Sequence, residues 1–281
     1  APGVDQAIQI EAIKLCIALL FKEGGALKTQ QIIATHLKGG RINSFIRQVI
    51  TLVDHLTLWH TKNEESNKKE VNDEKLPTEF LVLRLLQLMS EGHFLPNQRA
   101  MCIRCGTDNS STVLERLVSY LELLGHNMSS TSSEASLGVI SSLTEFVQGP
   151  CTENQLFLAL ETDLIEITNR LLRESDGSTS PEQQIALRKA SIELLQGILE
   201  AQEENSGIYV RMLSVIQVDM IEIIIESSKL YGQYEDAAIL ETECLVLLEM
   251  FYNYKPDLRR GRESTSDVLH IGRIEVLWLG R

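Results

Sequence analysis

The sequence is poor in cysteine and aromatic residues, and it has no long apolar run. Five cysteines among 281 residues are too few, and odd in number, for a disulfide framework, which favours a reducing compartment. The longest uninterrupted apolar segment, residues 15–21, is far shorter than the roughly 20 residues that a membrane-spanning helix needs. We therefore expect a cytosolic chain that does not cross a membrane.

Motifs of common catalytic and nucleotide-binding sites are also missing from the sequence. There is no Gly-rich phosphate loop, GxSxG elbow, HExxH motif or EF-hand loop. Positive charge is in the minority, since 26 Lys and Arg stand against 39 Asp and Glu for a formal net charge of -13, and such a field repels nucleic-acid phosphates. The sequence predicts neither an enzyme nor a nucleic-acid-binding protein, and it predicts no organic cofactor.

What the sequence does contain is helical periodicity over most of its length. Apolar residues recur at intervals of three and four, as at Val139, Ile140, Leu143, Phe146 and Val147, and charged residues fill the other faces. This pattern predicts an all-α fold. The predicted helices span residues 5–23, 28–38, 42–60, 78–91, 94–104, 111–125, 134–148, 152–174, 182–203, 207–229 and 236–254.

Polar interruptions at residues 61–77, 127–133 and 175–181 have the composition of loops. Helices of this length with short links suit an armadillo-like α-solenoid, in which stacked repeats share a continuous core, although no repeated sequence signature is evident. The predicted parts of the chain are helical repeats (1–60), a flexible linker (61–77), a larger helical domain (78–255) and a basic linker that leads into a β-rich domain (256–281).

The last segment of the chain has a different pattern. Ile274, Val276 and Trp278 alternate with other residues between positions 271 and 279, which predicts a single β-strand. A lone strand leaves its edge hydrogen bonds unpaired, so its partner strands are expected beyond the given sequence. Because the chain also starts with Ala1, both ends are expected to be cuts through a longer protein.

One pair of cysteines has the spacing of a metal site. Cys102 and Cys105 form a CxxC, and His93 and His126 are conceivable partners for a Cys2His2 zinc site. A single CxxC is weak evidence, because a closed zinc site needs four ligands and no second motif supplies them. We expect these cysteines to bind no zinc.

Two carboxylates are candidates for an ion site. Glu91 closes an apolar helix and precedes Gly92, a residue typical of a left-handed helix stop, while Glu145 and Gln148 lie three residues apart on the polar face of another helix. Carboxylate and amide oxygens are ligands that calcium prefers, but solvated residues on ordinary amphipathic helices show the same pattern. The residue types alone leave both interpretations open.

Several segments resemble the inositol trisphosphate receptor and ryanodine receptor family. SSLTEFVQGPCTENQ, at residues 141–155, is similar to the family signature Ser-Leu-Thr-Glu-aromatic-x-Gln-Gly-Pro-Cys-x-x-Asn-Gln almost without change. LRLLQLMSEGH, at residues 83–93, resembles a family helix that ends in Cys-Glu-x-His, with Ser90 in place of the cysteine. IALLFKEGG at residues 17–25 and GRIEVLWLGR at the C-terminal end resemble two further family segments.

This resemblance implies a receptor homology-associated (RIH-associated) domain, spanning residues 78–255, on the cytosolic face of the endoplasmic or sarcoplasmic reticulum membrane. It implies a ligand-gated calcium-release channel whose partners are the rest of the same chain and the other subunits of a homotetramer. It further implies that Glu91 and Glu145 are ligands of a regulatory calcium ion, completed by a backbone carbonyl from a segment after the pore, and that His93 and Gln148 support them.

Two functions of different classes therefore compete at this stage. One is the regulatory segment of a calcium-release channel, which senses calcium and couples cytosolic signals to the pore. The other is a stand-alone α-solenoid scaffold that binds partner peptides. Downstream sequence distinguishes them, because only a channel has transmembrane helices and a selectivity filter.

Overall fold

The computed structural model describes residues 2–22, 25–38, 41–66, 76–105, 111–173, 179–203 and 206–259. Within these ranges the chain is helical apart from its turns, and the extended pairing found there is an isolated antiparallel bridge between Cys105 and Ser111. The all-α prediction is confirmed for this part of the chain. The strand predicted at residues 271–279 lies outside the described residues.

The bounds of the helices follow the predicted ones with a few differences. In chain order the helices are α1 (Pro2–Leu20), α2 (Leu27–Lys38), α3 (Ile42–Ser66), η1 (Thr78–Phe80), α4 (Leu81–Ser90), α5 (Leu95–Ala100), α6 (Val113–Leu124), α7 (Ser130–Val147), α8 (Thr152–Leu160), α9 (Leu164–Arg173), α10 (Pro181–Leu199), α11 (Ile208–Val215), α12 (Val218–Lys229), α13 (Glu235–Tyr254) and η3 (Pro256–Leu258).

Two long predicted helices are each broken in the structure. The helix predicted at 152–174 divides into α8 and α9 at Thr162. The Thr162 hydroxyl donates to Leu158 O (2.6 Å) and accepts from Leu164 N (3.3 Å). Such side-chain hydrogen bonds compete with the backbone hydrogen bonds of a helix. The helix predicted at 207–229 divides into α11 and α12 at Ile216, which is extended and buried. Its apolar pattern is continuous across the break, so the sequence carries no stop signal there.

Polar segments near the helix starts act partly as caps. The predicted loop 127–133 includes the first turn of α7, whose N-cap Ser129 accepts a hydrogen bond from Ser132 N. Capping boxes begin α6, at Thr112 and Glu115, and α10, at Ser180 and Gln183. The predicted linker also begins later than expected, because α3 continues past residue 60 to Ser66.

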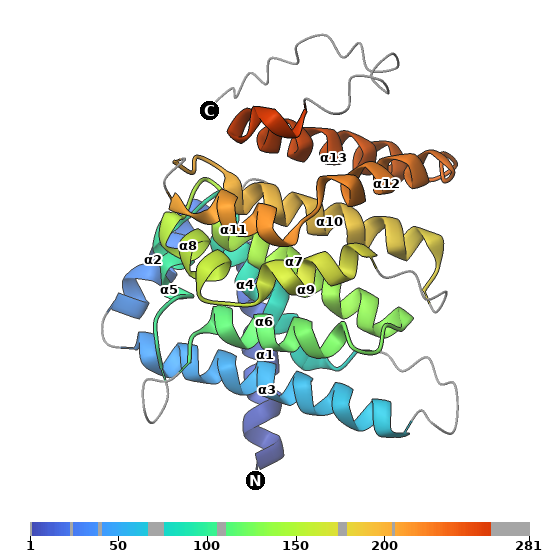
Figure 1. Ribbon diagram of the computed structural model, residues 1–281. Coiled ribbons are helices and arrows are strands. Elements are labelled where there is room, and N and C mark those ends of the chain that lie inside the picture. The colour runs from blue at the N-terminus through green and yellow to red at the C-terminus, as the bar shows by residue number, and fades with distance from the viewer. Residues whose placement is uncertain are drawn as a thin grey trace.

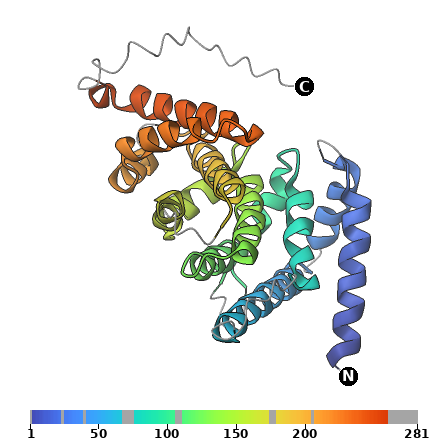
Figure 2. The same cartoon turned by 90° about the vertical axis from the view of Figure 1, so that its right-hand side faces the viewer.

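The helices stack side by side in rows along a curved array (Figures 1 and 2). A row of α1, α4, α7, α10 and α13 runs through the array, each helix packed on the next. The helices α2, α5, α8 and α11 form a second row, again in contact one after another, while α3, α6 and α9 form a third. Within the described residues the chain thus repeats a set of three helices, as in an α-solenoid. The armadillo-like label remains a prediction.

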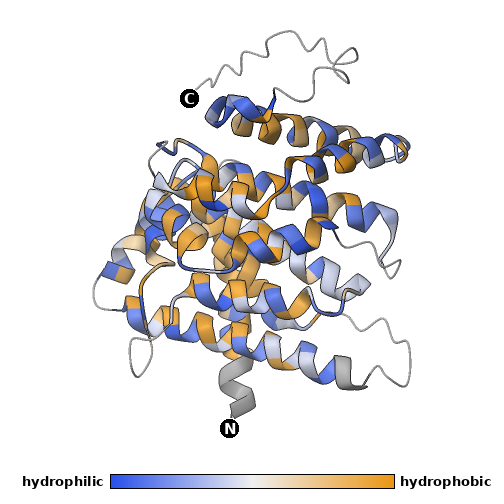
Figure 3. Ribbon diagram, in the orientation of Figure 1, coloured by the Kyte–Doolittle hydropathy of each residue, from blue (hydrophilic) through white to orange (hydrophobic). Residues whose placement is uncertain are grey.

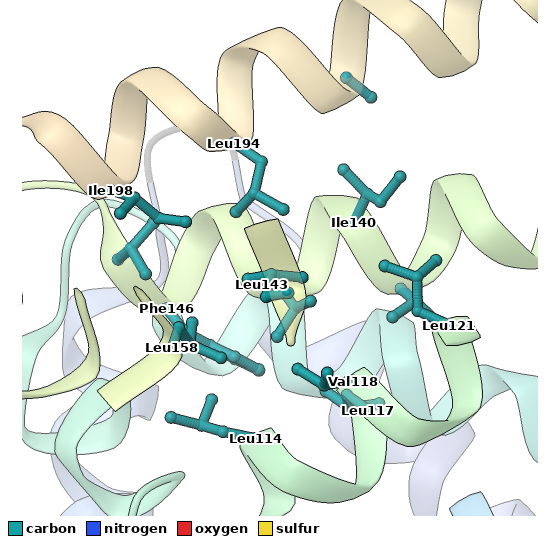
Figure 4. Close-up of a cluster of buried hydrophobic side chains, with 14 of the residues drawn as sticks. Leu114, Leu117, Val118, Leu121, Ile140, Leu143, Phe146, Leu158, Leu194 and Ile198 are labelled. Atoms are coloured by element: carbon teal, nitrogen blue, oxygen red, sulfur yellow. The ribbon is translucent and has the colours of Figure 1, made fainter. Parts of the chain in front are cut away.

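The centre of the core lies around α7. Leu143 and Phe146 of α7 are fully buried and meet side chains from α6, α8 and α10 (Figure 4). Apolar and polar residues alternate in short stretches along most of the helices (Figure 3). The terminal helix α1 differs, since Ile8, Leu15 and Leu19 on its outer side are 63%, 61% and 59% exposed. Among the described residues, no helix combines the length and apolar character that crossing a membrane requires.

Candidate functional site

The candidate site lies where α4 and α7, which pack against each other, both end. Glu91 is the C-cap of α4 and is half-buried. Gly92 (φ 72°) and His93 (φ 61°) follow in the left-handed region, so the predicted helix stop at Gly92 is present. The conformation favours glycine at the first position, while His93 adopts it at some cost in strain.

Glu145 occupies the last turn of α7 and is also half-buried. Burial, and after it the negative charge of Glu91, raises the pKa of its carboxyl from 4.5 to about 7, although Arg84 acts in the opposite direction. The structure therefore brings Glu91 and Glu145 close enough to repel each other. Both carboxylates stand at C-terminal helix ends, where the helix dipole also disfavours negative charge.

Gln148 and His93 lie at the same edge as the two carboxylates. Gln148 is the C-cap of α7, where its N–H still bonds Thr144 O while an extended ψ of 149° turns its carbonyl out of the helix. The shared polar face of Glu145 and Gln148 stays a prediction. The ring of His93 packs against the α7–α8 turn, since a Cβ built on Gly149 would lie 2.4 Å from the Cβ of His93.

Buried amides hold these helix ends, and their role was not predicted. Gln98 of α5 donates through Nε2 to Glu145 O (2.7 Å) and Gln148 O (2.8 Å). Gln30 of α2 donates in the same way to Leu88 O (3.0 Å) and Glu91 O (2.7 Å). In each case the acceptors are the C-cap and the residue three positions before it, which are carbonyls left without helical partners.

A third amide repeats this arrangement one step along the array. Gln155 of α8 donates to Gly197 O (2.7 Å) and Glu200 O (3.0 Å) at the end of α10. The three glutamines close similar heptapeptides, GGALKTQ at 24–30, GHFLPNQ at 92–98 and GPCTENQ at 149–155. A glycine six residues before a buried glutamine is therefore a sequence signal of the repeat. It is too short to recognise until the hydrogen bonds show which positions correspond.

The other candidate metal ligands do not gather into a site. Cys105 is buried and its thiol contacts Asn43 Oδ1 at 3.3 Å, while Cys102 is half-buried at the end of α5. Across the described ranges, no group of three or more His, Cys, Asp and Glu side chains has a geometry that could hold a metal ion. The pair Glu91 and Glu145 is thus two carboxylates and no more, fewer oxygens than the 6 to 8 that calcium takes.

Comparison with known families identifies the part of the chain that contains this pair. Residues 74–172 match the family model described as RyR and IP3R Homology associated. This part of the chain is similar to that family. The matched residues include α4, which Glu91 caps, and α7, which contains Glu145. The family resemblance stated from the sequence motifs is confirmed.

Proposed function

We propose that this chain is a cytosolic regulatory segment of an intracellular ligand-gated calcium-release channel, and that it senses calcium at Glu91 and Glu145. The family is named for two receptors of this class. The proposal includes the placement on the reticulum membrane and the homotetramer, with the rest of the channel as its partner.

The observation that carries the proposal is the unfavourable electrostatic environment of the two carboxylates. Glu91 and Glu145 repel each other at two adjoining helix ends, and burial adds to the cost of charging Glu145. A divalent cation between them would replace their repulsion with attraction to the ion and would offset the cost of burial, and hard carboxylate oxygens suit calcium. His93 and Gln148 stand at the same edge and would support the ion indirectly.

Such a site can couple binding to gating because it is incomplete. Two carboxylates leave coordination positions open, so further oxygens must come from water or from another segment of the channel. An ion shared between this domain and a pore-linked segment favours the conformation that brings them together. The affinity for calcium then depends on the state of the pore, and the converse holds by linkage.

Calorimetric titration of the chain with calcium chloride tests the proposal. We expect weak binding, and we expect Glu91→Gln and Glu145→Gln each to raise the Kd by about tenfold or more, because each removes a ligand charge of the kind that sets calcium affinity. Glu161→Gln is the matched control, since Glu161 is the exposed C-cap of α8. Unchanged binding in both site variants would refute the site, as would equal loss in the control.

The scaffold alternative receives support from one observation. The exposed apolar side chains of α1, at Ile8, Leu15 and Leu19, suit contact with another protein element. That contact is compatible with a channel as well as with a stand-alone scaffold. In a complete channel, a calcium dose response that shifts to higher concentration in Glu145→Gln would favour the channel, whereas binding of peptides without any calcium effect would favour the scaffold.

A further inference from the structure

The short helix α5 joins the ends of α4 and α7 through two neighbouring side chains. Asn97 Nδ2 donates to Met89 O of α4 at 2.7 Å, and Gln98 Nε2 donates to Glu145 O and Gln148 O of α7. Both amides are 1% exposed. The two helix ends that bear the candidate ligands are therefore hydrogen-bonded to consecutive residues of α5.

A second set of hydrogen bonds to these helix ends, here called a brace like the first set from Asn97 and Gln98, comes from α2, which packs on α5. Gln30 is 1% exposed and bonds Glu91 O and Leu88 O at the end of α4. The backbone carbonyl of each candidate ligand thus accepts a hydrogen bond from a buried amide. Glu91 O accepts from Gln30 Nε2, and Glu145 O accepts from Gln98 Nε2. Hydrogen bonds from buried amides are costly to break, because the carbonyls would then lack a partner in a place that water does not reach.

We propose that Gln98, Asn97 and Gln30 are positioning residues that set the separation of the Glu91 and Glu145 carboxylates. The inference rests on the proposed calcium site and names the groups that build it. Ligand oxygens must lie roughly 2.3 to 2.6 Å from a calcium ion, so a small shift of one helix end removes its carboxylate from the ion. Displacement of α5 relative to α4 and α7 would change calcium affinity without touching either carboxylate.

The next repeat supplies an internal control for this inference. Asn154 and Gln155 of α8 brace the ends of α7 and α10 in the same way, through Phe146 O, Gly197 O and Glu200 O. The positions that correspond there to Glu91 and Glu145 are Gln148 and Gly197, which have no carboxylates. The brace recurs without the ligands, so its structural and its calcium-positioning contributions can be separated.

The experiment compares Gln98→Met with Gln155→Met by calcium titration and thermal unfolding. Each substitution keeps an unbranched side chain and removes two hydrogen bonds to carbonyls at a helix end. Gln155→Met also removes the hydrogen bond that Gln155 Oε1 accepts from Gln202 Nε2 (2.6 Å), so it is the more severe of the two changes. We expect Tm to fall in both variants, at least as far in Gln155→Met, and we expect only Gln98→Met to weaken calcium binding, by about tenfold, as supporting groups around metal ligands do. Gln30→Met makes the same test at Glu91 if Gln98→Met does not fold.

The outcomes separate this inference from the proposed function. If the native chain and Glu145→Gln show no difference in calcium binding, the proposed site fails and the inference fails with it. If Glu145→Gln weakens binding but Gln98→Met and Gln155→Met bind calcium equally well, the site stands and the positioning role is overturned. Equal weakening in both methionine variants also overturns it, because a general loss of stability would then account for the effect.

Discussion

At the scale of single residues, Glu145 is a carboxylate whose pKa the folded structure raises strongly. Its pKa rises from the ordinary 4.5 to about 7, first through burial and then through Glu91. Since the folded state holds this proton more tightly than the unfolded state, the stability that the neutral carboxyl supports is present below about pH 4.5 and is lost as the pH rises through about 7. Calcium-free protein should therefore lose this contribution at neutral pH.

The Glu145→Gln variant should be more stable than the native chain in the presence of a chelator at pH 8. The gain should be about 1 to 3 kcal/mol, because the amide cannot ionise and some solvent reaches the site. Near pH 5 the difference should largely disappear. Urea unfolding at both pH values measures it, with the exposed Glu122→Gln as control, and a gain that does not depend on pH would contradict the assignment.

A second residue-scale prediction concerns the contact between His93 and Gly149. Gly149 (φ 88°) and Gly207 (φ 81°) both have left-handed conformations, but a Cβ on Gly149 would meet His93, whereas nothing lies within 4 Å of one on Gly207. Gly207→Ala should cost about 1 kcal/mol in unfolding free energy from backbone strain alone. Gly149→Ala should cost about 2 to 4 kcal/mol, because the steric clash adds to that strain.

The double variant His93→Gly with Gly149→Ala isolates the steric part, because the Cβ of His93 as well as its ring would meet a Cβ at position 149. Removing the whole side chain should return the cost of the Gly149 substitution to that seen at Gly207, as a coupling energy in a double-mutant cycle measured by chemical denaturation. Additive effects of the two changes would show that the turns around His93 and Gly149 do not touch.

At the scale of the elements, α3 is joined to α6 by a buried polar pair as well as by apolar packing. Tyr120 is fully buried, and its hydroxyl lies 2.9 Å from His60 Nδ1, which is 3.3 Å from Leu56 O. Burial lowers the pKa of His60, while its backbone hydrogen bond acts in the other direction. The neutral ring therefore suits this interface.

Tyr120→Phe should lower the free energy of unfolding by about 1 kcal/mol, because it removes one buried hydrogen bond and leaves the ring packing intact. Tyr234→Phe, at a half-buried tyrosine at the start of α13, is the comparison. Chemical denaturation monitored by circular dichroism measures both. No loss of stability in Tyr120→Phe would mean that the polar pair does not hold α3.

At the scale of the whole molecule, stability should be transmitted mainly between neighbouring helices, since each long helix packs on the next in the row. Leu143→Ala in α7 should cost about 3 to 5 kcal/mol and speed hydrogen exchange throughout the array, because α7 lies at its centre. Leu240→Ala, equally buried but in the terminal helix α13, should speed exchange mainly in α12 and α13. Identical exchange patterns in the two variants would indicate one indivisible core.

The sequence by itself determined the helical class and most helix bounds, because apolar period and local motifs are properties of short segments. It also marked the helix stop at Gly92. Only the tertiary structure decided that Thr162 divides α8 from α9, and that Gln30 and Gln98 hold the ends of α4 and α7. These features depend on hydrogen bonds to carbonyls as many as 61 positions away, and residue types along the chain do not specify which distant carbonyl a buried amide will meet.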